Sequence, residues 1–468
     1  MVADTVDHAE SIVRCAAHLV IVGSLPTKYR RGMARWSGSG VVRNWAGNQA
    51  CVPAEVLSPS STGEVASIVS RAAADGRRVK VIGAGHSFTA TAMTDGMLVR
   101  LGAMDKILEV DNSTMRVRVE AGITLHKLNR QLHDLGLALP NLGDIDVQTV
   151  AGAISTATHG TGVELGNLAT MVVGMVLVDG LGHVVRIEGD DPLLSIAPVS
   201  LGALGIVCEV MLQCVPSFRL HAHETIERLD DLLLDIEGFA ASADHAEFFW
   251  MPGARRCQVK RNDRTEAPLD RPSRLSVVRD KYVGENLAFG AVCRVGRRWP
   301  HLAPRIAKVV SSSVSERELV DESFRVFSSP RMVRFVEMEY GIPLECLAEA
   351  VQRVRGVTEH LSFPSLFPIE VRVSAADDLA LSTGFGRRNG WIAVHQFRGA
   401  PYESYFQQVA TIMDSYGGRP HWGKMHWLSA EVLETRYPRW SEFVAARSSL
   451  DPEGTFRNEY LDRVLGPI

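Results

Sequence analysis

One histidine of this chain stands in a setting that suggests covalent chemistry. His86 follows two glycines directly in the segment Val81-Ile82-Gly83-Ala84-Gly85-His86-Ser87. Glycines at the end of a strand let backbone N–H groups approach phosphate oxygens, because no side chain blocks them. A neutral imidazole is a nucleophile, so His86 could bond to an electrophilic carbon such as the 8α-methyl of an oxidised flavin. Taken alone, the segment also fits a surface turn that carries a histidine.

The same glycines do not form a dinucleotide-binding turn of the GxGxxG type. That motif would need a third glycine at position 88, where Phe88 stands, and no clear helical pattern follows. A nicotinamide-dependent dehydrogenase is therefore a weaker alternative. It predicts that the purified protein holds no yellow cofactor.

A second segment, residues 141–162, combines small residues with many hydroxyl groups. It contains Asp144, Thr149, Gly152, Thr156, Ala157, Thr158 and His159. Each buried hydroxyl needs a hydrogen-bond partner, so few hydrophobic cores contain so many. A loop around a polar cofactor needs small residues for backbone approach and hydroxyls to bond ring and phosphate atoms. A third segment, Ser200–Val207, again places glycines before a strand, and it contains Ile206.

Charged residues of the C-terminal half could contact a substrate. Glu370 and Arg372 are two positions apart on a predicted strand, so their side chains share one face. Such a pair is either a structural ion pair or a polar patch beside a reacting centre, and the fragment alone favours the ion pair. Lys424 follows His421-Trp422-Gly423. His395 ends another predicted strand, where it could contact substrate or be a satisfied strand-end histidine.

The elements that must position these residues mix helices and strands without an internal repeat. Ser61 and Glu64 form a capping box before a helix that Gly76 ends. Thr124 caps a second helix, which Gly136 ends. Strands are predicted for residues 79–82, 115–119, 171–178, 184–187, 333–340, 368–374 and 391–397, and a helix for 343–354. This order indicates an α+β fold, with an antiparallel sheet covered by helices on one face in the C-terminal half.

The overall composition is that of a globular protein with two or three domains. The chain has 468 residues, of which 46% are hydrophobic and 22% charged. The net charge of -4 argues against broad nucleic-acid binding, which needs a basic face. The seven cysteines contain no CxxC pair, so we predict neither a metal site nor a dithiol motif. We expect free thiols in a reducing, cytoplasmic compartment.

The first 35 residues match no pattern of a folded domain. The apolar run within Ile12–Leu25 is too short to span a bilayer, and the residues before it are acidic rather than basic. We therefore expect a tail or a loosely attached helix at 1–35, and no transmembrane segment.

The three N-terminal segments, in this order and spacing, resemble the FAD-binding domain of the vanillyl-alcohol-oxidase flavoprotein superfamily over residues 45–217. The segments Phe367–Arg372, Pro420–Lys424 and Asp451–Leu461 resemble its aldonolactone oxidoreductase branch. That branch includes L-gulono-1,4-lactone oxidases and dehydrogenases, D-arabinono-1,4-lactone oxidases and alditol oxidases. The resemblance implies a two-subdomain FAD-binding domain at 36–217, an α+β cap domain with an antiparallel sheet at 218–430, and a segment 431–468 that returns to the FAD-binding domain.

The resemblance also implies roles for individual residues. His86 matches the histidine that bonds the flavin 8α carbon, and residues 141–162 contain no cysteine for a second tether. The expected catalytic residues are Glu370, Arg372 and Lys424, with His395 as a further contact. The expected cofactor-binding residues are Val81, Ile82, Gly83, Ala84, Gly85, His86, Ser87, Asp144, Thr149, Gly152, Thr156, Ala157, Thr158, His159 and, through its backbone, Ile206.

The implied activity is oxidation of a hydroxyl carbon of a sugar 1,4-lactone by hydride transfer to flavin N5. Arg372 and Lys424 would stabilise the developing alkoxide, while Glu370 orients a second hydroxyl. An alditol oxidase is the alternative, which Asp144 weakens because it stands where that branch has a serine that contacts substrate. A non-catalytic relative is a further alternative, against which the three catalytic residues argue. The electron acceptor, either oxygen or a redox protein or dye, stays open, although Gly143 leans towards oxygen access.

Overall fold

The computed structural model describes residues 35–36, 40–271, 286, 288–302 and 316–468. The tail expected at 1–35 therefore lies outside the described residues, except for its last residue. Arg35 belongs to strand β1 (Arg35–Trp36), which pairs with β2 (Val42–Arg43), and β2 pairs with β3 (Ala50–Cys51). No described helix has the length and apolar character needed to cross a membrane.

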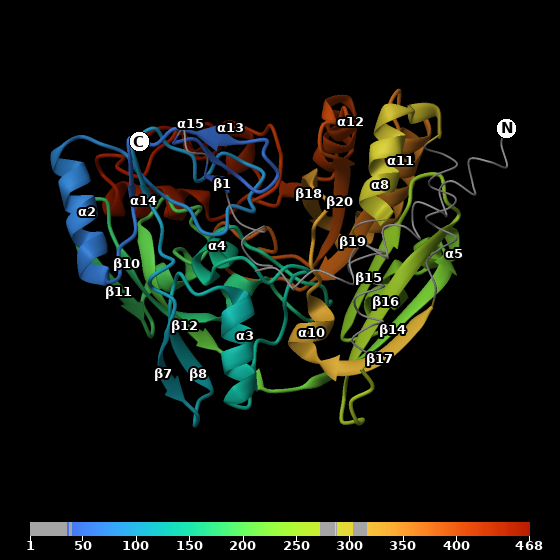
Figure 1. Cartoon of the computed structure of the whole chain (residues 1–468), viewed down its shortest axis with the longest axis horizontal. Helices are drawn as coiled ribbons and strands as arrows, with labels where there is room; N and C mark the ends of the chain where they lie inside the picture. The colour runs from blue at the N-terminus through green and yellow to red at the C-terminus, as the bar shows by residue number, and fades with distance from the viewer. Residues whose placement is uncertain (1–34, 37–39, 272–285, 287, 303–315) are drawn as a thin grey trace, which may run out of the picture.

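The N-terminal half is built on two sheets with helices against them (Figure 1). A parallel sheet has the strand order β4 (Glu55–Leu57), β6 (Met97–Val99), β5 (Val79–Val81). An antiparallel sheet has the order β11 (Val184–Glu188), β10 (Val172–Val178), β12 (Ile206–Gln213), β8 (Arg116–Glu120), β7 (Ile107–Asp111). The other elements of this half are α2 (Thr62–Ala74), α3 (Leu125–Asp134), α4 (Val150–Ser155), η2 (Leu168–Met171), η3 (Pro192–Ser195), β9 (Leu137–Ala138) and β13 (Val215–Pro216).

The predicted caps of α2 and α3 are confirmed, with one difference. Ser61 Oγ accepts a hydrogen bond from the Glu64 N–H at 3.2 Å, but the Glu64 carboxylate accepts from the N–H of Ser60, not of Ser61. Gly76 follows α2 with φ of +62°, in the left-handed region that favours glycine. Thr124 Oγ1 accepts from the Lys127 N–H at the start of α3.

The C-terminal half is built on one antiparallel sheet, which confirms the α+β prediction. Its strand order is β17 (Arg317–Glu322), β14 (Arg219–Arg228), β16 (Arg256–Thr265), β15 (His245–Trp250), β19 (Ile369–Ser374), β20 (Asn389–Phe397), β18 (Phe335–Pro343), β21 (Arg419–Pro420). The helices α11 (Leu347–Glu359) and α12 (Glu403–Asp414) share an apolar core with this sheet. The shorter elements are α5 (Leu229–Leu234), α6 (Ile236–Ala240), α8 (Phe289–Arg298), η5 (Pro300–Leu302), α10 (Ser323–Phe327) and η6 (Leu344–Cys346).

The helix predicted for residues 343–354 is displaced along the chain. Pro343 is the last residue of β18, and its ψ of 133° continues the extended backbone. A single 3-10 turn follows, and α11 begins only at Leu347. A proline has no N–H and a fixed φ, so it fits the end of a strand as well as the start of a helix.

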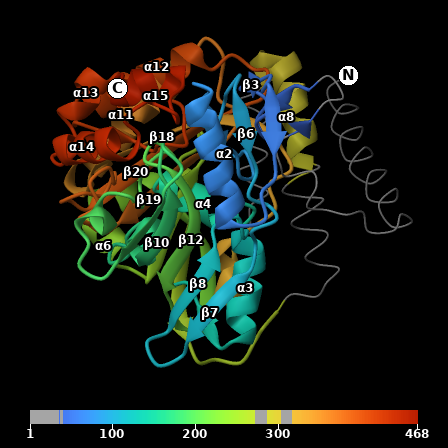
Figure 2. The same ribbon diagram turned by 90° about the vertical axis from the view of Figure 1, so that its left-hand side faces the viewer.

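The C-terminal helices α13 (Ala430–Glu434), α14 (Trp440–Leu450) and α15 (Glu459–Leu465) pack against the N-terminal half (Figures 1 and 2). The buried Lys80 ammonium donates to the carbonyl of Phe456 at 3.1 Å. Asn458 Nδ2 donates to the carbonyls of Ala90, Thr91 and Met93, in the loop that follows His86. The closing segment therefore braces the loop that carries the candidate cofactor residues.

The change of sheet near residue 217 does not separate two independent cores. Leu379, Ala380, Leu381 and Trp422, all within 218–430, belong to the apolar core of the N-terminal half. The predicted domain boundaries therefore stay a prediction.

Candidate active site

A cavity lies between the N-terminal half and one face of the large sheet of the C-terminal half. Ten of the predicted site residues line it: His86, Ser87, Asp144, Thr156, Thr158, His159, Glu370, Arg372, His395 and Lys424. The first and last of these residues, His86 and Lys424, are more than 300 positions apart in the sequence. The fold brings them into the same cavity. Gly143, which precedes Asp144, lines the same cavity.

The remaining predicted cofactor residues are not among those that line this cavity. Ala157 and Ile206 turn their side chains into the cores of the N-terminal half, so only their backbone could contact a cofactor. Ala157 has a φ of +53°, which is uncommon for a residue with a side chain. Thr149 caps the short helix α4 through the Gly152 N–H at 3.2 Å, and these two residues adjoin the glycine loop. Val81 and Ile82 lead from β5 into that loop.

The glycine loop fits a cofactor that carries phosphates. Within the described part of the chain, the backbone N–H groups of Gly83, Ala84, Gly85 and Ser87 donate no hydrogen bond to the protein. Gly85 has a φ of +71°, and a Cβ on Gly83 would lie 2.5 Å from Thr149 Oγ1, so both positions need glycine. Consecutive N–H groups without protein partners form the donor set that a pyrophosphate accepts from. The residues present therefore fit the FAD that the sequence implies.

His86 enters the cavity at the end of this loop. Its ring stacks on the indole of Trp45, with centroids 5.1 Å apart and 21° between the planes. Trp45 donates its backbone N–H to the carbonyl of Gly85 at 2.7 Å, so the stacked pair is also tied through the main chain. The loop meets the predicted catalytic segment here, because the Phe88 N–H donates to the carbonyl of Gly423 at 2.7 Å.

The charged residues opposite the loop share one face of the sheet because side chains alternate along a strand. This face holds Glu337 and Glu339 of β18, Glu370 and Arg372 of β19, His395 of β20 and Glu247 of β15. Glu337 lies directly opposite His395 in the register. The intervening residues, such as Met338 and Val371, face the apolar core on the other side. The same-face prediction for Glu370 and Arg372 agrees with the lining of the cavity.

Arg372 is surrounded by three carboxylates. Its Nη2 pairs with Glu370 and Asp144, and its Nε donates to Glu247 at 2.8 Å. Burial opposes the charge of Arg372, but these carboxylates raise its pKa well above the ordinary value. Burial raises the pKa of Glu370 to about 7, and the attraction of Arg372 only partly opposes this shift. Glu370 therefore changes its protonation near neutral pH.

Asp144 belongs to this charged group as well as to the second predicted cofactor segment. Its carboxylate also pairs with Arg331 at 2.5 Å, and its carbonyl accepts from the Ser329 N–H at 2.9 Å. Burial favours the neutral acid, but Arg372 and Arg331 lower the pKa of Asp144 below its ordinary value. The Asp144 carboxylate thus links the segment that carries Arg331 to the strand that carries Arg372.

Lys424 is held by an acidic residue that the sequence did not single out. Glu337 Oε2 lies 2.5 Å from Lys424 Nζ, and Glu337 Oε1 lies 3.4 Å from His395 Nε2. Burial would favour neutral groups, but this pairing lowers the pKa of Glu337 to about 2 and raises the pKa of Lys424. The second ring nitrogen of His395 is 3.1 Å from the carbonyl of Pro368. Lys424 and His395 are thus oriented by one carboxylate.

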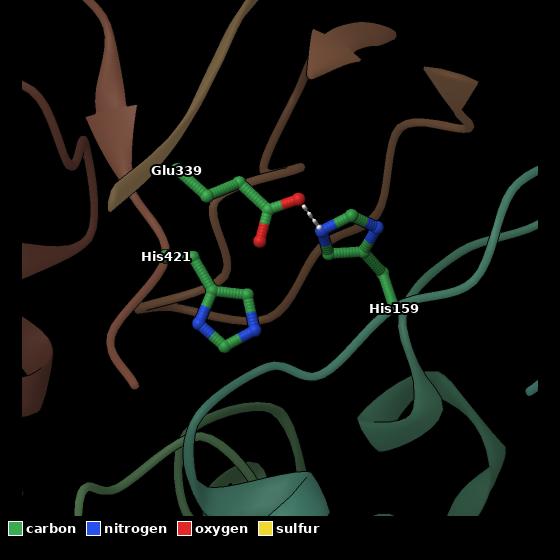
Figure 3. A group of neighbouring side chains, drawn as sticks. All are labelled: His159, Glu339 and His421. Carbon is green, nitrogen blue, oxygen red and sulfur yellow. Dashed lines mark ion pairs between the residues drawn. The ribbon is translucent and has the colours of Figure 1, made fainter. Parts of the chain in front are cut away.

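His159 contacts a second buried carboxylate, that of Glu339 (Figure 3). His159 Nε2 lies 3.2 Å from Glu339, and Nδ1 lies 2.8 Å from the carbonyl of Gly160. The imidazole stacks on Trp391 with centroids 3.7 Å apart. Both ring nitrogens of His159 therefore have protein partners, which favours a role in holding its loop. His421 beside them accepts the Gly423 N–H, and burial lowers its pKa to about 3.

Among the described residues, two groups that include residues of this cavity bring carboxylates or imidazoles close enough together to raise the question of a metal ion. They are His159, Glu339 and His421, and Asp144, Glu247 and Glu370. In the second group Arg372 pairs with all three carboxylates, and Arg331 and Lys260 pair with two of them. In the first, Glu339 pairs with His159, and His421 uses one nitrogen as an acceptor for backbone. These groups therefore fit an organic substrate site, and we assign no metal to them.

Sequence reasoning missed Glu337, Glu339, Glu247, Trp45 and Arg331. A signal existed for the first two, because Phe335-Val336-Glu337-Met338-Glu339-Tyr340 alternates acidic and apolar residues within a predicted strand. A buried strand rarely carries two acids on one face unless they have partners. The other three residues carry no local signal, since their roles depend on distant partners.

Comparisons with known proteins agree with this geometry. The family model described as D-arabinono-1,4-lactone oxidase matches residues 210–464, and the model described as FAD binding domain matches residues 53–188. The chain is 44% identical over 426 residues to an L-gulono-1,4-lactone dehydrogenase of Mycobacterium tuberculosis, covering 91% of this chain and 99% of that protein. It is 32% identical over 432 residues to an L-gulonolactone oxidase of Mus musculus, covering 90% and 98%.

Two further comparisons concern another relative and a solved structure. An alditol oxidase of a Streptomyces species is 33% identical over 441 residues, covering 91% of this chain and 99% of that protein. Among solved structures, a solvent-stable cholesterol oxidase superposes with a TM-score of 0.78 at 19% identity, covering 92% of this chain and 97% of that one. At that identity the structural likeness supports the fold only.

Proposed function

Because this chain belongs to the aldonolactone oxidoreductase branch of the vanillyl-alcohol-oxidase-type FAD-binding proteins, we propose that it oxidises a hydroxyl carbon of a sugar 1,4-lactone of the L-gulono-1,4-lactone type. One observation carries this proposal. Lys424, Arg372 and Glu370 line the same cavity as His86. Cations, an acceptor for a neighbouring hydroxyl and a flavin loop are the parts that carbinol oxidation requires.

Bound FAD would supply the acceptor for the hydride of the carbinol carbon, and the chain's own residues prepare the substrate. Lys424 and Arg372 donate hydrogen bonds to the hydroxyl oxygen as it gains negative charge. Glu370, whose pKa of about 7 leaves it partly ionised at neutral pH, accepts a hydrogen bond from a second hydroxyl and fixes the orientation of the ring. Glu337 keeps Lys424 protonated and in place.

We further propose that FAD is attached covalently through His86. The glycine loop, in which the N–H groups of Gly83, Ala84 and Gly85 donate to no described residue, leads directly to this imidazole, which lines the cavity. Stacking on Trp45 fixes the plane of the ring before any bond forms. Residues 141–162 contain no cysteine, so a second tether from that segment is not part of the proposal.

The location of the protein is also a proposal. Six cysteines lie in the described part of the chain and none of them forms a disulfide. Free thiols agree with the reducing, cytoplasmic compartment expected from the sequence.

The decisive experiment is anaerobic reduction of the purified holoenzyme by a panel of substrates. The panel contains L-gulono-1,4-lactone, L-galactono-1,4-lactone, D-arabinono-1,4-lactone and the open-chain polyols xylitol and sorbitol. We expect at least one lactone to bleach the flavin absorbance faster than either polyol at equal concentration. Faster bleaching by a polyol would select the alditol oxidase alternative, and bleaching by no member of the panel would refute the proposal.

A further inference from the structure

A second cavity of about 530 Å³ adjoins the candidate active site. Four arginines line it: Arg294 and Arg297 of α8, Arg334 before β18, and Arg398 directly after β20. Among the described residues, no acid belongs to its lining, whereas Phe397 and Met332 supply apolar surface. This cavity is therefore cationic and partly apolar, and neither the proposed reaction nor the family models assign it a role.

The positive charge of three of these four arginines is not neutralised by any described carboxylate. Arg294, Arg297 and Arg398 form no ion pair with any described carboxylate, although Arg372, Arg388 and Arg439 elsewhere each have at least one. Arg297 is nevertheless oriented, because its Nη1 donates to the carbonyl of Arg398 at 3.3 Å and its guanidinium lies 5.5 Å from the Phe397 ring centroid. Three arginines gathered without a described carboxylate partner create a positive potential that attracts anions.

The cationic cavity lies on the side of the active site where His86 enters. Asn286 and Val333 line both cavities. Arg398 also packs against Gly47, where a Cβ would lie 2.6 Å from Arg398 Nη2. Gly47 is two residues from Trp45, the stacking partner of His86. An anion held by these arginines would thus be close to the loop that carries the proposed flavin attachment.

We propose that this cavity binds a small anionic one-electron acceptor that reoxidises the enzyme. The inference rests on the proposed function, because oxidation of a carbinol to a carbonyl leaves the two electrons and the proton of the hydride on the enzyme, while the hydroxyl proton is released to water. Two acceptor anions take one electron each, and the proton passes to water. Positive potential beside the reduced cofactor would raise the local concentration of such an anion, and the effect would weaken as salt screens the charges.

The test measures reoxidation separately from substrate oxidation. The holoenzyme is reduced anaerobically with dithionite, so that no lactone is needed, and is then mixed with ferricyanide, a trianion, or with phenazine methosulfate, a cation. The test variant is the double substitution Arg297→Gln with Arg398→Gln. The control is Arg78→Gln with Arg130→Gln, which removes the same charge from exposed positions outside the lining of the cavity.

In the wild type, the reoxidation rate with ferricyanide should fall as ionic strength rises. The Arg297/Arg398 variant should lose roughly tenfold or more of that rate at low salt, and its dependence on salt should be flatter. Its rate with phenazine methosulfate should be unchanged or higher, and the control should behave as the wild type. An unchanged ferricyanide rate in the variant, or an equal loss in the control, would overturn the inference.

Equilibrium binding of ferrocyanide to the oxidised holoenzyme provides a second measurement. Loss of ferrocyanide binding together with loss of the reoxidation rate supports an acceptor site. If binding is lost while the rate is kept, the cavity holds anions without serving electron transfer, and the proposal is wrong. If no member of the substrate panel reduces the flavin but the ferricyanide and ferrocyanide results are as expected, only the proposed lactone activity is refuted, and the acceptor site is still supported.

Discussion

Glu337 and Lys424 form an ion pair of 2.5 Å inside the candidate active site, and the Glu337 carboxylate also lies 3.4 Å from His395. Glu337 is only 5% exposed, so its charge depends on these partners. The register places it directly opposite His395, and the turn after Trp422 brings Lys424 to its other oxygen. We infer that Glu337 is a positioning residue, which fixes both the place and the charge of Lys424.

The first prediction follows from this pair. Glu337→Gln keeps the shape of the side chain but removes the charge that raises the pKa of Lys424, while burial continues to lower it. Lys424 then loses its proton at a lower pH. The rate of flavin reduction, which needs the ammonium form, should therefore decline at a lower alkaline pH than in the wild type. Stopped-flow reduction measured from neutral to alkaline pH checks this shift.

The matched control for Glu337→Gln is Met338→Leu on the same strand. Met338 faces the apolar core on the opposite side of the sheet. Its substitution should leave the pH profile in place, since it changes no charge in the cavity. If Glu337→Gln also leaves the alkaline limb in place, Glu337 does not govern the protonation of Lys424.

A second prediction concerns how substrate affinity depends on pH near neutrality. Burial raises the pKa of Glu370 from 4.5 to about 7, so this group is protonated below that pH and ionised above it. The ionised form is the better acceptor for a substrate hydroxyl, so substrate affinity should increase as pH rises through about 7. Glu370→Gln should weaken binding together with rate, and its affinity should no longer depend on pH in this range. The apparent dissociation constant from the reductive half-reaction reports this directly.

The raised pKa of Glu370 also makes the stability of the folded protein depend on pH, in a direction that can be stated. Its pKa is higher in the folded protein than the ordinary value, so the fold favours the neutral carboxyl. The resulting stabilisation is complete at low pH and is lost as pH rises through about 7. The difference in melting temperature between the wild type and Glu370→Gln should change across this window and be constant well above it.

A third prediction separates the two half-reactions. Loss of one pre-organised cation at the developing alkoxide should cost about 3 kcal/mol, or roughly a hundredfold in the rate of flavin reduction. Lys424→Ala is the suitable variant. Arg372→Ala would leave three buried carboxylates without their common partner and would destabilise the fold as well. Reoxidation of dithionite-reduced Lys424→Ala should stay near the wild-type rate. Flavin reduction at the wild-type rate would show that Lys424 is structural.

A fourth prediction tests the attachment of the cofactor. Wild-type protein precipitated with acid should retain its yellow colour, because a covalent bond to His86 survives denaturation. His86→Ala should release the colour into the supernatant. His183→Ala, at a side chain that is 71% exposed, is the control and should keep the colour. Free flavin in the supernatant of the wild type would refute the covalent bond while leaving FAD binding intact.

The parts of the site that depend on local rules could be predicted from the sequence. The turn before His86 needs glycine for its backbone, and Glu370 and Arg372 share a face because of the two-residue period of a strand. Ion pairs between segments that are distant in the sequence cannot be predicted from such local patterns. Glu337 was within a predicted strand, but its partner Lys424 is far along the chain, and only the packing of the C-terminal segments brings them together.

The same distinction explains the role of Asp144. The sequence placed it in a segment expected to contact the cofactor. Its carboxylate in fact joins two guanidinium groups, one on the sheet and one on a loop across the cavity. Neither Arg331 nor its distance from Asp144 could be read from the residues around position 144. We propose that the position of Asp144 bears on substrate selection, and the last prediction tests this.

Asp144→Ser should shift the preference of the enzyme from lactones towards open-chain polyols. The carboxylate pairs with Arg331 at 2.5 Å and so holds one wall of the cavity against Arg372. A serine is shorter and neutral, so it would free space and release Arg331, and an extended polyol needs more room than a compact ring. We expect the ratio of kcat/KM for L-gulono-1,4-lactone to that for xylitol to fall roughly tenfold. Asp144→Asn, which keeps the size, separates the effect of charge from that of space. If the ratio is unchanged in both variants while melting temperatures fall, Asp144 serves the stability of the cavity and does not select the substrate.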